Sequence, residues 1–210
     1  MRKEQYEALQ AAAEAGDYLS IAINEDGAPV QGCFIPWERT VSAFNMKTPK
    51  VTLSVKDLDT PEIMGKLGQC KLTGCYLFAP MDDYGFLSSF STLNDLFILH
   101  GERMRNLSYI HDMPELFLFY LENAALPDLS PLIENCNRGS SLPGKCFGFY
   151  HCSVADTSAL SDIRFSLSEL LIWPVEGDQR ERWSTARRAG TFRFYEKKHG
   201  PSELQKGDLP

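Results

Sequence analysis

The feature that most constrains the fold of this chain is a series of short apolar runs that recur from residue 51 onward. Successive runs start 24, 21, 20, 30, 24 and 22 residues apart. Periods in this range are typical of repeat proteins, in which each unit buries its apolar face against the next. Four to six apolar residues per run, rich in Phe, Tyr, Ile and Val, predict strands that are buried on both faces. The runs are Val51–Val55, Cys75–Phe78, Leu96–Leu99, Leu116–Leu121, Cys146–Tyr150, Leu170–Val175 and Phe192–Tyr195.

Two central units align with each other at an offset of 22 residues. The aligned pairs are Leu96 with Leu118, Ile98 with Tyr120, Gly101 with Asn123, Met104 with Leu126, Leu107 with Leu129, and Ile110 with Leu132. The pattern resembles the leucine-rich repeat, in which two alternating strand residues are followed by an Asn or Cys and then by further leucines. Asn123 fits the Asn/Cys position, and so does Cys152 in the unit that begins at Phe147.

The resemblance covers residues 50–196 and is most specific over residues 93–133. It implies an α/β solenoid of about seven short parallel strands, with short helices or turns on the convex side. Parallel strands need crossover connections, and the spacing leaves room only for short helices or turns. In such proteins, the concave strand face typically binds a partner.

The first 48 residues have a different pattern. Helix-forming residues over 3–15, followed by Gly16, predict a helix and its end. Alternating apolar residues over 18–23 and a second apolar segment over 30–37 flank the turn sequence Asn24-Glu25-Asp26-Gly27 and predict a hairpin. We therefore expect a helix and hairpin cap over residues 1–48, a repeat array over 49–199 and a flexible tail over 200–210.

The charge of the chain is unevenly distributed. The net charge is −7, but residues 180–199 hold seven Lys or Arg against two Glu, and residues 200–210 carry −1, which leaves −11 on the first 179 residues. An acidic body argues against general nucleic-acid binding, because affinity for phosphates comes from basic residues. The basic segment 180–198, where arginines alternate with aromatic residues, remains an alternative nucleic-acid surface.

The chain shows no signal-peptide pattern and no apolar run of membrane-spanning length. We therefore expect a cytoplasmic protein that makes no membrane contact and whose six cysteines are thiols. Their spacing lacks the paired motif of a zinc site, so neither a metal nor another cofactor is expected.

The repeat alignment also assigns side chains to the two faces of the strands. The residues between the inward positions should form an outward apolar stripe, and large exposed apolar patches usually mark an interface. We expect this stripe to bind another protein or a second copy of the chain, without catalysis. The predicted concave-face residues are Tyr76, Phe78, Phe97, Leu99, His100, Phe119, Leu121, Tyr150, His151 and Tyr195.

Two alternatives to this interpretation stay open. The stripe is core if residues 1–48 fold over it, or if the strand register is off by one, which exchanges the two faces. The chain could also be an enzyme that uses His100 or His151 with Cys152 and the carboxylates of Glu122 and Asp128. Adjacent residues such as His151 and Cys152 point to opposite faces of a continuing strand, which is poor geometry for a nucleophile and its base.

Overall fold

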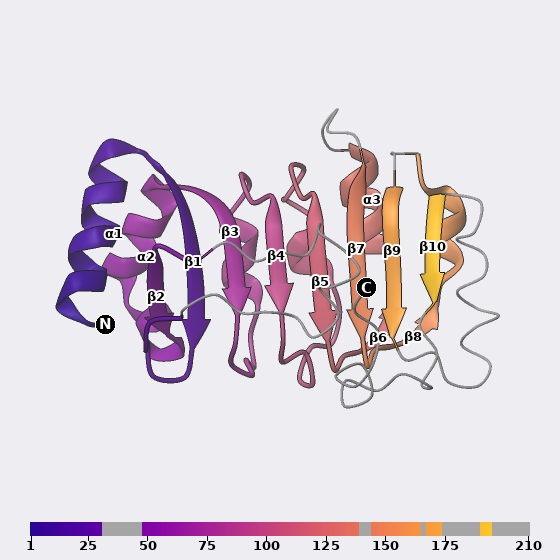
Figure 1. Ribbon diagram of the computed structural model, residues 1–210, viewed down its shortest axis with the longest axis horizontal. Helices are drawn as coiled ribbons and strands as arrows, with labels where there is room; N and C mark the ends of the chain where they lie inside the picture. Colours follow the sequence, from indigo (N-terminus) through magenta and orange to yellow (C-terminus); the bar gives the residue numbers. More distant parts are fainter. Residues whose placement is uncertain (31–47, 139–143, 165–166, 174–189, 195–210) are drawn as a thin grey trace, which may run out of the picture.

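The computed structural model describes residues 1–30, 48–138, 144–164, 167–173 and 190–194. Within these residues, eight strands form one sheet in which every neighbouring pair is parallel (Figure 1). In spatial order the strands are β2 (Val51–Ser54), β1 (Tyr18–Asn24), β3 (Lys71–Leu77), β4 (Asp95–Ile98), β5 (Leu118–Glu122), β7 (Lys145–Tyr150), β9 (Leu167–Trp173) and β10 (Gly190–Phe194).

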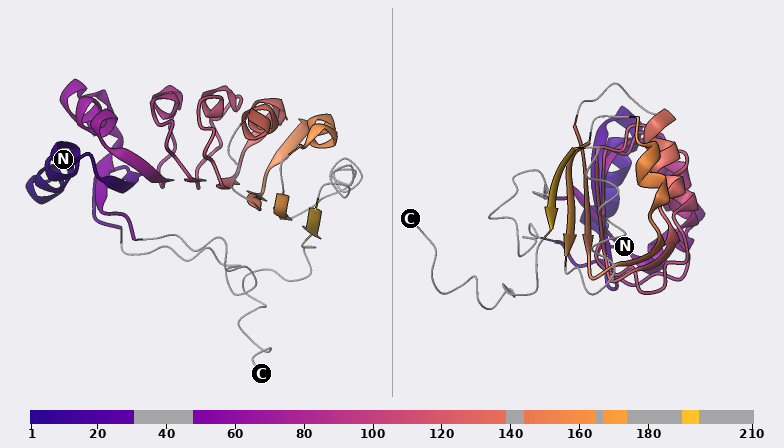
Figure 2. Two further views of the ribbon diagram at one scale, coloured as in Figure 1. Left: turned by 90° about the horizontal axis from the view of Figure 1, so that it is seen from above. Right: turned by 90° about the vertical axis from the view of Figure 1, so that its right-hand side faces the viewer.

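The connecting helices lie along one face of the sheet, and the layers form a shallow arc (Figure 2). Several connections contain only a turn of 3₁₀ helix, which suits their short length. The helices are α1 (Lys3–Ala15), α2 (Pro61–Gln69) and α3 (Ser130–Arg138), and the 3₁₀ helices are η3 (Val55–Asp59), η4 (Gly85–Ser89), η5 (Ser108–Ile110) and η6 (Ser158–Asp162). A second parallel pair, β6 (Ala125–Asp128) and β8 (Ser153–Asp156), follows β5 and β7.

The α/β class and the parallel strands are confirmed. Each of the seven apolar runs corresponds to one strand of the main sheet, and from β3 onward the strand order across the sheet follows the order along the chain. At the other end of the sheet, β2 lies outside β1, so the chain from β2 must pass β1 to reach β3.

The prediction that β1 forms one strand of a hairpin is wrong. β1 lies between β2 and β3 and pairs in parallel with both, so neither of its edges is open to an antiparallel partner. Its apolar residues alternate as a hairpin strand would, but they are buried on both faces of the main sheet. Residues 31–37 of the predicted second strand lie outside the described residues.

The predicted N-terminal helix is confirmed at residues 3–15. Gly16 ends it in the left-handed conformation (φ 60°), which glycine adopts without steric penalty. Its amide and that of Asp17 donate to the last carbonyl groups of the helix. Leu9 is fully buried in the main core, which fixes α1 at the β1–β2 end of the sheet.

The main core lies between the sheet and its helices. The strand register aligns Cys75, Leu96, Phe119 and Phe147 in one row across four strands, and all four belong to this core. Among the described residues, no helix has the length and apolar composition needed to cross a membrane.

Candidate functional site

The face of the sheet opposite the helices carries a second apolar cluster. Tyr76, Phe97 and Tyr120 form its centre, with ring centroids 5.3 and 5.7 Å apart along the row. All three side chains are fully buried. Val30, which follows β1 and its turn, packs against the same cluster. Tyr76 and Phe97 thus lie on the predicted face, but they are not open surface.

The predicted face of Phe119 and Leu121 is wrong. Both side chains belong to the main core on the helix side, and Leu118 and Tyr120 lie on the opposite face. The register pairs Leu96 with Phe119, an offset of 23 residues rather than 22. A one-residue shift exchanges the two faces of a strand. The sequence does not reveal this shift in register, because the four residues from 118 to 121 are all apolar or aromatic and fit either face.

The same shift moves the predicted Asn/Cys position. Leu121 aligns with Phe149, so the counterpart of Cys152 is Ala124 and not Asn123. The Cys152 thiol lies 3.3 Å from the carbonyl oxygen of Leu121 and donates to it across the strand end. Asn123 is instead the counterpart of His151, and both residues have positive φ angles, 58° and 51°. The Asn123 side-chain amide nevertheless donates to the carbonyl oxygen of Leu99 at 3.5 Å, which is a bond of the predicted kind.

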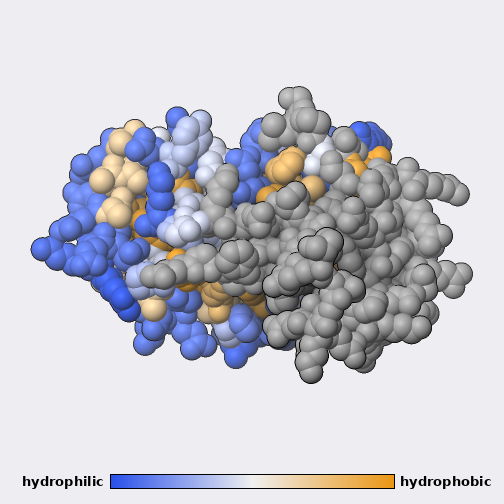
Figure 3. All heavy atoms as spheres, in the orientation of Figure 1, coloured by the Kyte–Doolittle hydropathy of each residue, from blue (hydrophilic) through white to orange (hydrophobic). Residues whose placement is uncertain are grey.

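The accessible part of the predicted face lies where the strands end. Phe78, Leu99, Glu122 and Tyr150 each come directly after four aligned residues of β3, β4, β5 and β7, and we call them the strand-end row. All four are half-buried, whereas their neighbours inside the strands are buried. In the orientation that looks onto this face, apolar described residues reach the surface between hydrophilic margins (Figure 3).

Glu122 is the one charged member of this row. Burial raises the pKa of its carboxyl group, and Glu102 raises it further, while a hydrogen bond from the Tyr120 hydroxyl and the nearby His100 lower it; the net shift is upward. His100 is half-buried, with its Nδ1 3.3 Å from Oε1 of Glu102. His151 is exposed at the end of β7, and its ring lies 4.4 Å from that of Tyr150.

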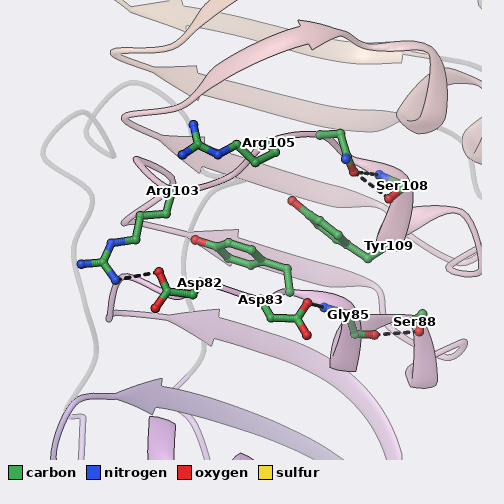
Figure 4. A pocket seen from close by; sticks show the side chains of 10 residues that line it. Asp82, Asp83, Gly85, Ser88, Arg103, Arg105, Ser108 and Tyr109 are labelled. Atoms are coloured by element: carbon green, nitrogen blue, oxygen red, sulfur yellow. Dashed lines mark hydrogen bonds and ion pairs between the residues drawn. The ribbon is translucent and has the colours of Figure 1, made fainter.

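A polar pocket of about 420 Å³ lies between the loops that follow β3 and β4 (Figure 4). The first loop contributes Asp82 and Asp83, and the second contributes Arg103, Arg105 and Tyr109. Our sequence reasoning did not identify this pocket. A signal was present, because Asp82 and Arg103, which form an ion pair at 2.8 Å, are 21 residues apart, the same offset as the Cys75 and Leu96 runs.

Two of the residues considered for catalysis, Cys152 and Asp128, are hydrogen-bonded to the backbone. Cys152 is buried, and burial raises its pKa to about 12, so its thiol stays protonated and donates to backbone carbonyl groups. Asp128 instead accepts a hydrogen bond from the amide of Ser130 at the start of α3. Within the described ranges, no group of three or more His, Cys, Asp or Glu side chains is placed to hold a metal ion.

The remaining predicted residues fall mostly outside the described ranges. Tyr195 lies there, as does segment 180–198 apart from β10.

No protein-family model, no characterised protein sequence and no solved structure matches this chain. Function is therefore inferred from the geometry of the strand-end row.

Proposed function

We propose that this protein is a non-catalytic protein-interaction module whose strand-end row binds a partner protein. The observation that carries the proposal is the row itself. Three large apolar side chains, Phe78, Leu99 and Tyr150, stay half-buried on adjacent strands around a single desolvated carboxylate. Rigid apolar anchors around a few polar groups are typical of binding hot spots.

The backbone arrangement supports a short, irregular leucine-rich-repeat-like solenoid as the scaffold. From β3 to β9, each strand of the main sheet is added beside the previous one, and helices or 3₁₀ turns return along one face. The hydrogen bond from the Cys152 thiol to the carbonyl oxygen of Leu121 joins two successive units at a strand end, as expected of the Asn/Cys position in such a repeat. The exchanged order of β1 and β2 makes the first units the atypical ones, as terminal repeats often are.

The partner should carry a basic side chain flanked by apolar groups. Glu122 lacks a cationic side-chain partner among the described residues other than the nearby His100, and Glu102 adds further negative charge. A Lys or Arg from a partner would compensate the desolvated carboxylate. A symmetric dimer through this row would bring Glu122 and Glu102 towards their copies, and like charges at an interface are unfavourable. We therefore favour a different protein over a second copy of this chain.

The test compares matched surface variants in quantitative affinity capture from the cells that make the protein. Leu99→Ser and Phe78→Ser remove apolar anchors from the row. Tyr18→Ser is the matched control, because Tyr18 is a large hydrophobic residue with 65% of its surface exposed at the start of β1. We expect the two row variants to lose the same co-purifying protein and the control to retain it.

Light scattering over a concentration series completes this test. We expect a monomer at all concentrations. If the row variants and the control retain the same proteins, the row is not the binding surface. A concentration-dependent dimer that Leu99→Ser abolishes would replace the proposed partner with a second copy of the chain.

The enzyme and nucleic-acid alternatives have less support. The protonated, buried Cys152 is a poor nucleophile, because the thiolate is the reactive form. Nucleic-acid binding would require segment 180–198 to overcome an acidic body. The five cysteines that the structure describes are free thiols, which supports the cytoplasm as the proposed compartment.

A further inference from the structure

The pocket between the β3 and β4 loops contains two hydrogen-bond donors that the surrounding residues leave unused. Most of the other polar groups that line it are already satisfied. Arg103 forms an ion pair with Asp82 at 2.8 Å, and the Asp83 carboxylate accepts a hydrogen bond from the amide of Gly85 at 2.7 Å. The hydroxyl group of Tyr84 donates to the carbonyl oxygen of His100 at 2.8 Å.

Tyr109 and Arg105 are different. The Tyr109 hydroxyl oxygen is buried and has no hydrogen-bond partner. Leaving such a group without a partner destabilises the fold, and native proteins seldom do so. Among the residues that the structure describes, Arg105 has neither an ion pair nor a hydrogen bond, although its side chain lines the same pocket. Figure 4 shows the hydroxyl end of Tyr109 directed to the side of the pocket where Arg105 lies.

We propose that this pocket binds a carboxylate group, which Arg105 holds through paired hydrogen bonds while the Tyr109 hydroxyl donates to one of its oxygens. Guanidinium and carboxylate groups match in planar, bidentate geometry. Burial raises the pKa of Tyr109, which keeps the hydroxyl protonated as a donor. The stacked ring of Tyr84, with its centroid 5.4 Å away, holds the Tyr109 ring in place.

The charges of the pocket favour a carboxylate over a phosphate. The lining holds two arginines and two aspartates, so its charges sum to zero and each charge on a bound anion adds net negative charge to the site. A doubly charged phosphate would bring excess negative charge close to Asp82 and Asp83. The volume of about 420 Å³ is within the range of small-molecule sites. This inference is independent of the strand-end row and would hold if the proposed function were wrong.

The test is a set of NMR titrations of the ¹⁵N-labelled full chain at constant ionic strength. The probes are acetate, succinate, inorganic phosphate and the peptide acetyl-Gly-Glu-Gly-amide, and the signals are the Arg105 Nε–H and the amides of Gly85 and Ser108. We expect saturable shifts with the carboxylates and weaker binding of phosphate. If the peptide binds more tightly than succinate, the carboxylate comes from a partner's side chain; the reverse order assigns it to a small organic acid.

Three variants make the titration decisive. Arg105→Gln and Tyr109→Phe should each weaken carboxylate binding by about tenfold or more, on the scale of one charge-assisted hydrogen bond. Tyr109→Phe removes only the unsatisfied hydroxyl, so the stacked ring and the fold should be retained. Lys56→Gln removes an exposed positive charge from η3 and should leave binding unchanged. Three results would each overturn the proposal. They are chemical shifts that grow linearly without saturation, shifts of the Gly85 and Ser108 amides in Arg105→Gln equal to those of the wild type, and phosphate binding as tight as that of succinate.

Discussion

The backbone amide of Gly101 donates a hydrogen bond to the carbonyl oxygen of Glu122 at 2.9 Å, and a Cβ atom at Gly101 would lie only 2.7 Å from that same oxygen. It would also lie 3.0 Å from Cβ of Ala124. The close approach of the two units therefore requires glycine. It also ties the loop after β4 to the backbone of the strand-end row.

Gly101→Ala should therefore destabilise the protein. The new methyl group meets the backbone oxygen of Glu122 and the Cβ atom of Ala124, which cannot move aside as the end of a flexible side chain can. We expect a loss of about 1–3 kcal/mol in the free energy of unfolding, the usual cost of overpacking a buried site, measured by urea denaturation. Gly65→Ala in α2 is the control, since its Cβ would meet nothing within 4 Å. That change should stabilise the protein by about 0.5–1 kcal/mol. Equal effects of the two substitutions would refute the steric explanation.

Glu122→Gln should stabilise the protein at neutral pH. Burial raises the pKa of Glu122, so the folded state disfavours the ionised form. The stability that the protonated carboxyl contributes is fully present below the unfolded pKa of about 4.3 and is lost as pH rises through the folded pKa. Glutamine keeps an oxygen acceptor for the Tyr120 hydroxyl without the charge. The melting temperature of the variant should exceed that of the wild type near pH 7, and the difference should shrink towards pH 4. A difference that does not change with pH would contradict this explanation.

Asp57 should show the opposite pH dependence. Burial raises its pKa, but bonds from the Met1 ammonium group and from the amide and hydroxyl of Ser54 lower it more, so the net shift is downward. Its ionised form thus stabilises the fold above the unfolded pKa of about 3.9, and this stabilisation is lost as pH falls through the lowered pKa. Asp57→Asn should cost about 1–3 kcal/mol near pH 7, with a smaller cost in acid. Urea titrations at several pH values measure both effects, and a cost that grows in acid would reverse the assigned sign.

Cys152 should be unreactive in the folded protein. Burial raises the pKa of its thiol to about 12, and the thiol is also engaged with the carbonyl oxygen of Leu121. An alkylating reagent at pH 7 to 8 should modify Cys152 only after denaturation, as judged by mass spectrometry of its peptide. Cys70 is half-buried and serves as a reference for partial accessibility. Rapid native labelling of Cys152 would restore the enzyme alternative.

The sequence predicted the strands better than it predicted their faces. Apolar runs mark buried strands because both faces of a covered parallel sheet are apolar, and all seven runs are strands. For the same reason, the runs carry little information on register. Residues 118 to 121 are apolar throughout, so Phe119 and Leu121 could be placed on the correct face only through the observed pairing with β4.

Long-range pairing also explains the other differences. β1 alternates like a hairpin strand, and only its parallel pairing with β2 and β3 shows that it belongs to the main sheet. The pocket depends on two loops that meet because β3 and β4 are adjacent, which no local pattern states. Both cases depend on contacts between distant residues, whereas α1, which depends on local propensity and Gly16, was predicted at its observed bounds.

The most direct test of the binding surface is site-specific photo-cross-linking in the cells that make the protein. A benzophenone amino acid replaces Leu99 in the strand-end row or, in a parallel sample, the exposed Tyr18 at the start of β1. We expect irradiation to yield one discrete adduct with another protein from position 99 and none from position 18. Adducts from position 18 alone, or the same diffuse adducts from both positions, would contradict the claim that the strand-end row binds a partner.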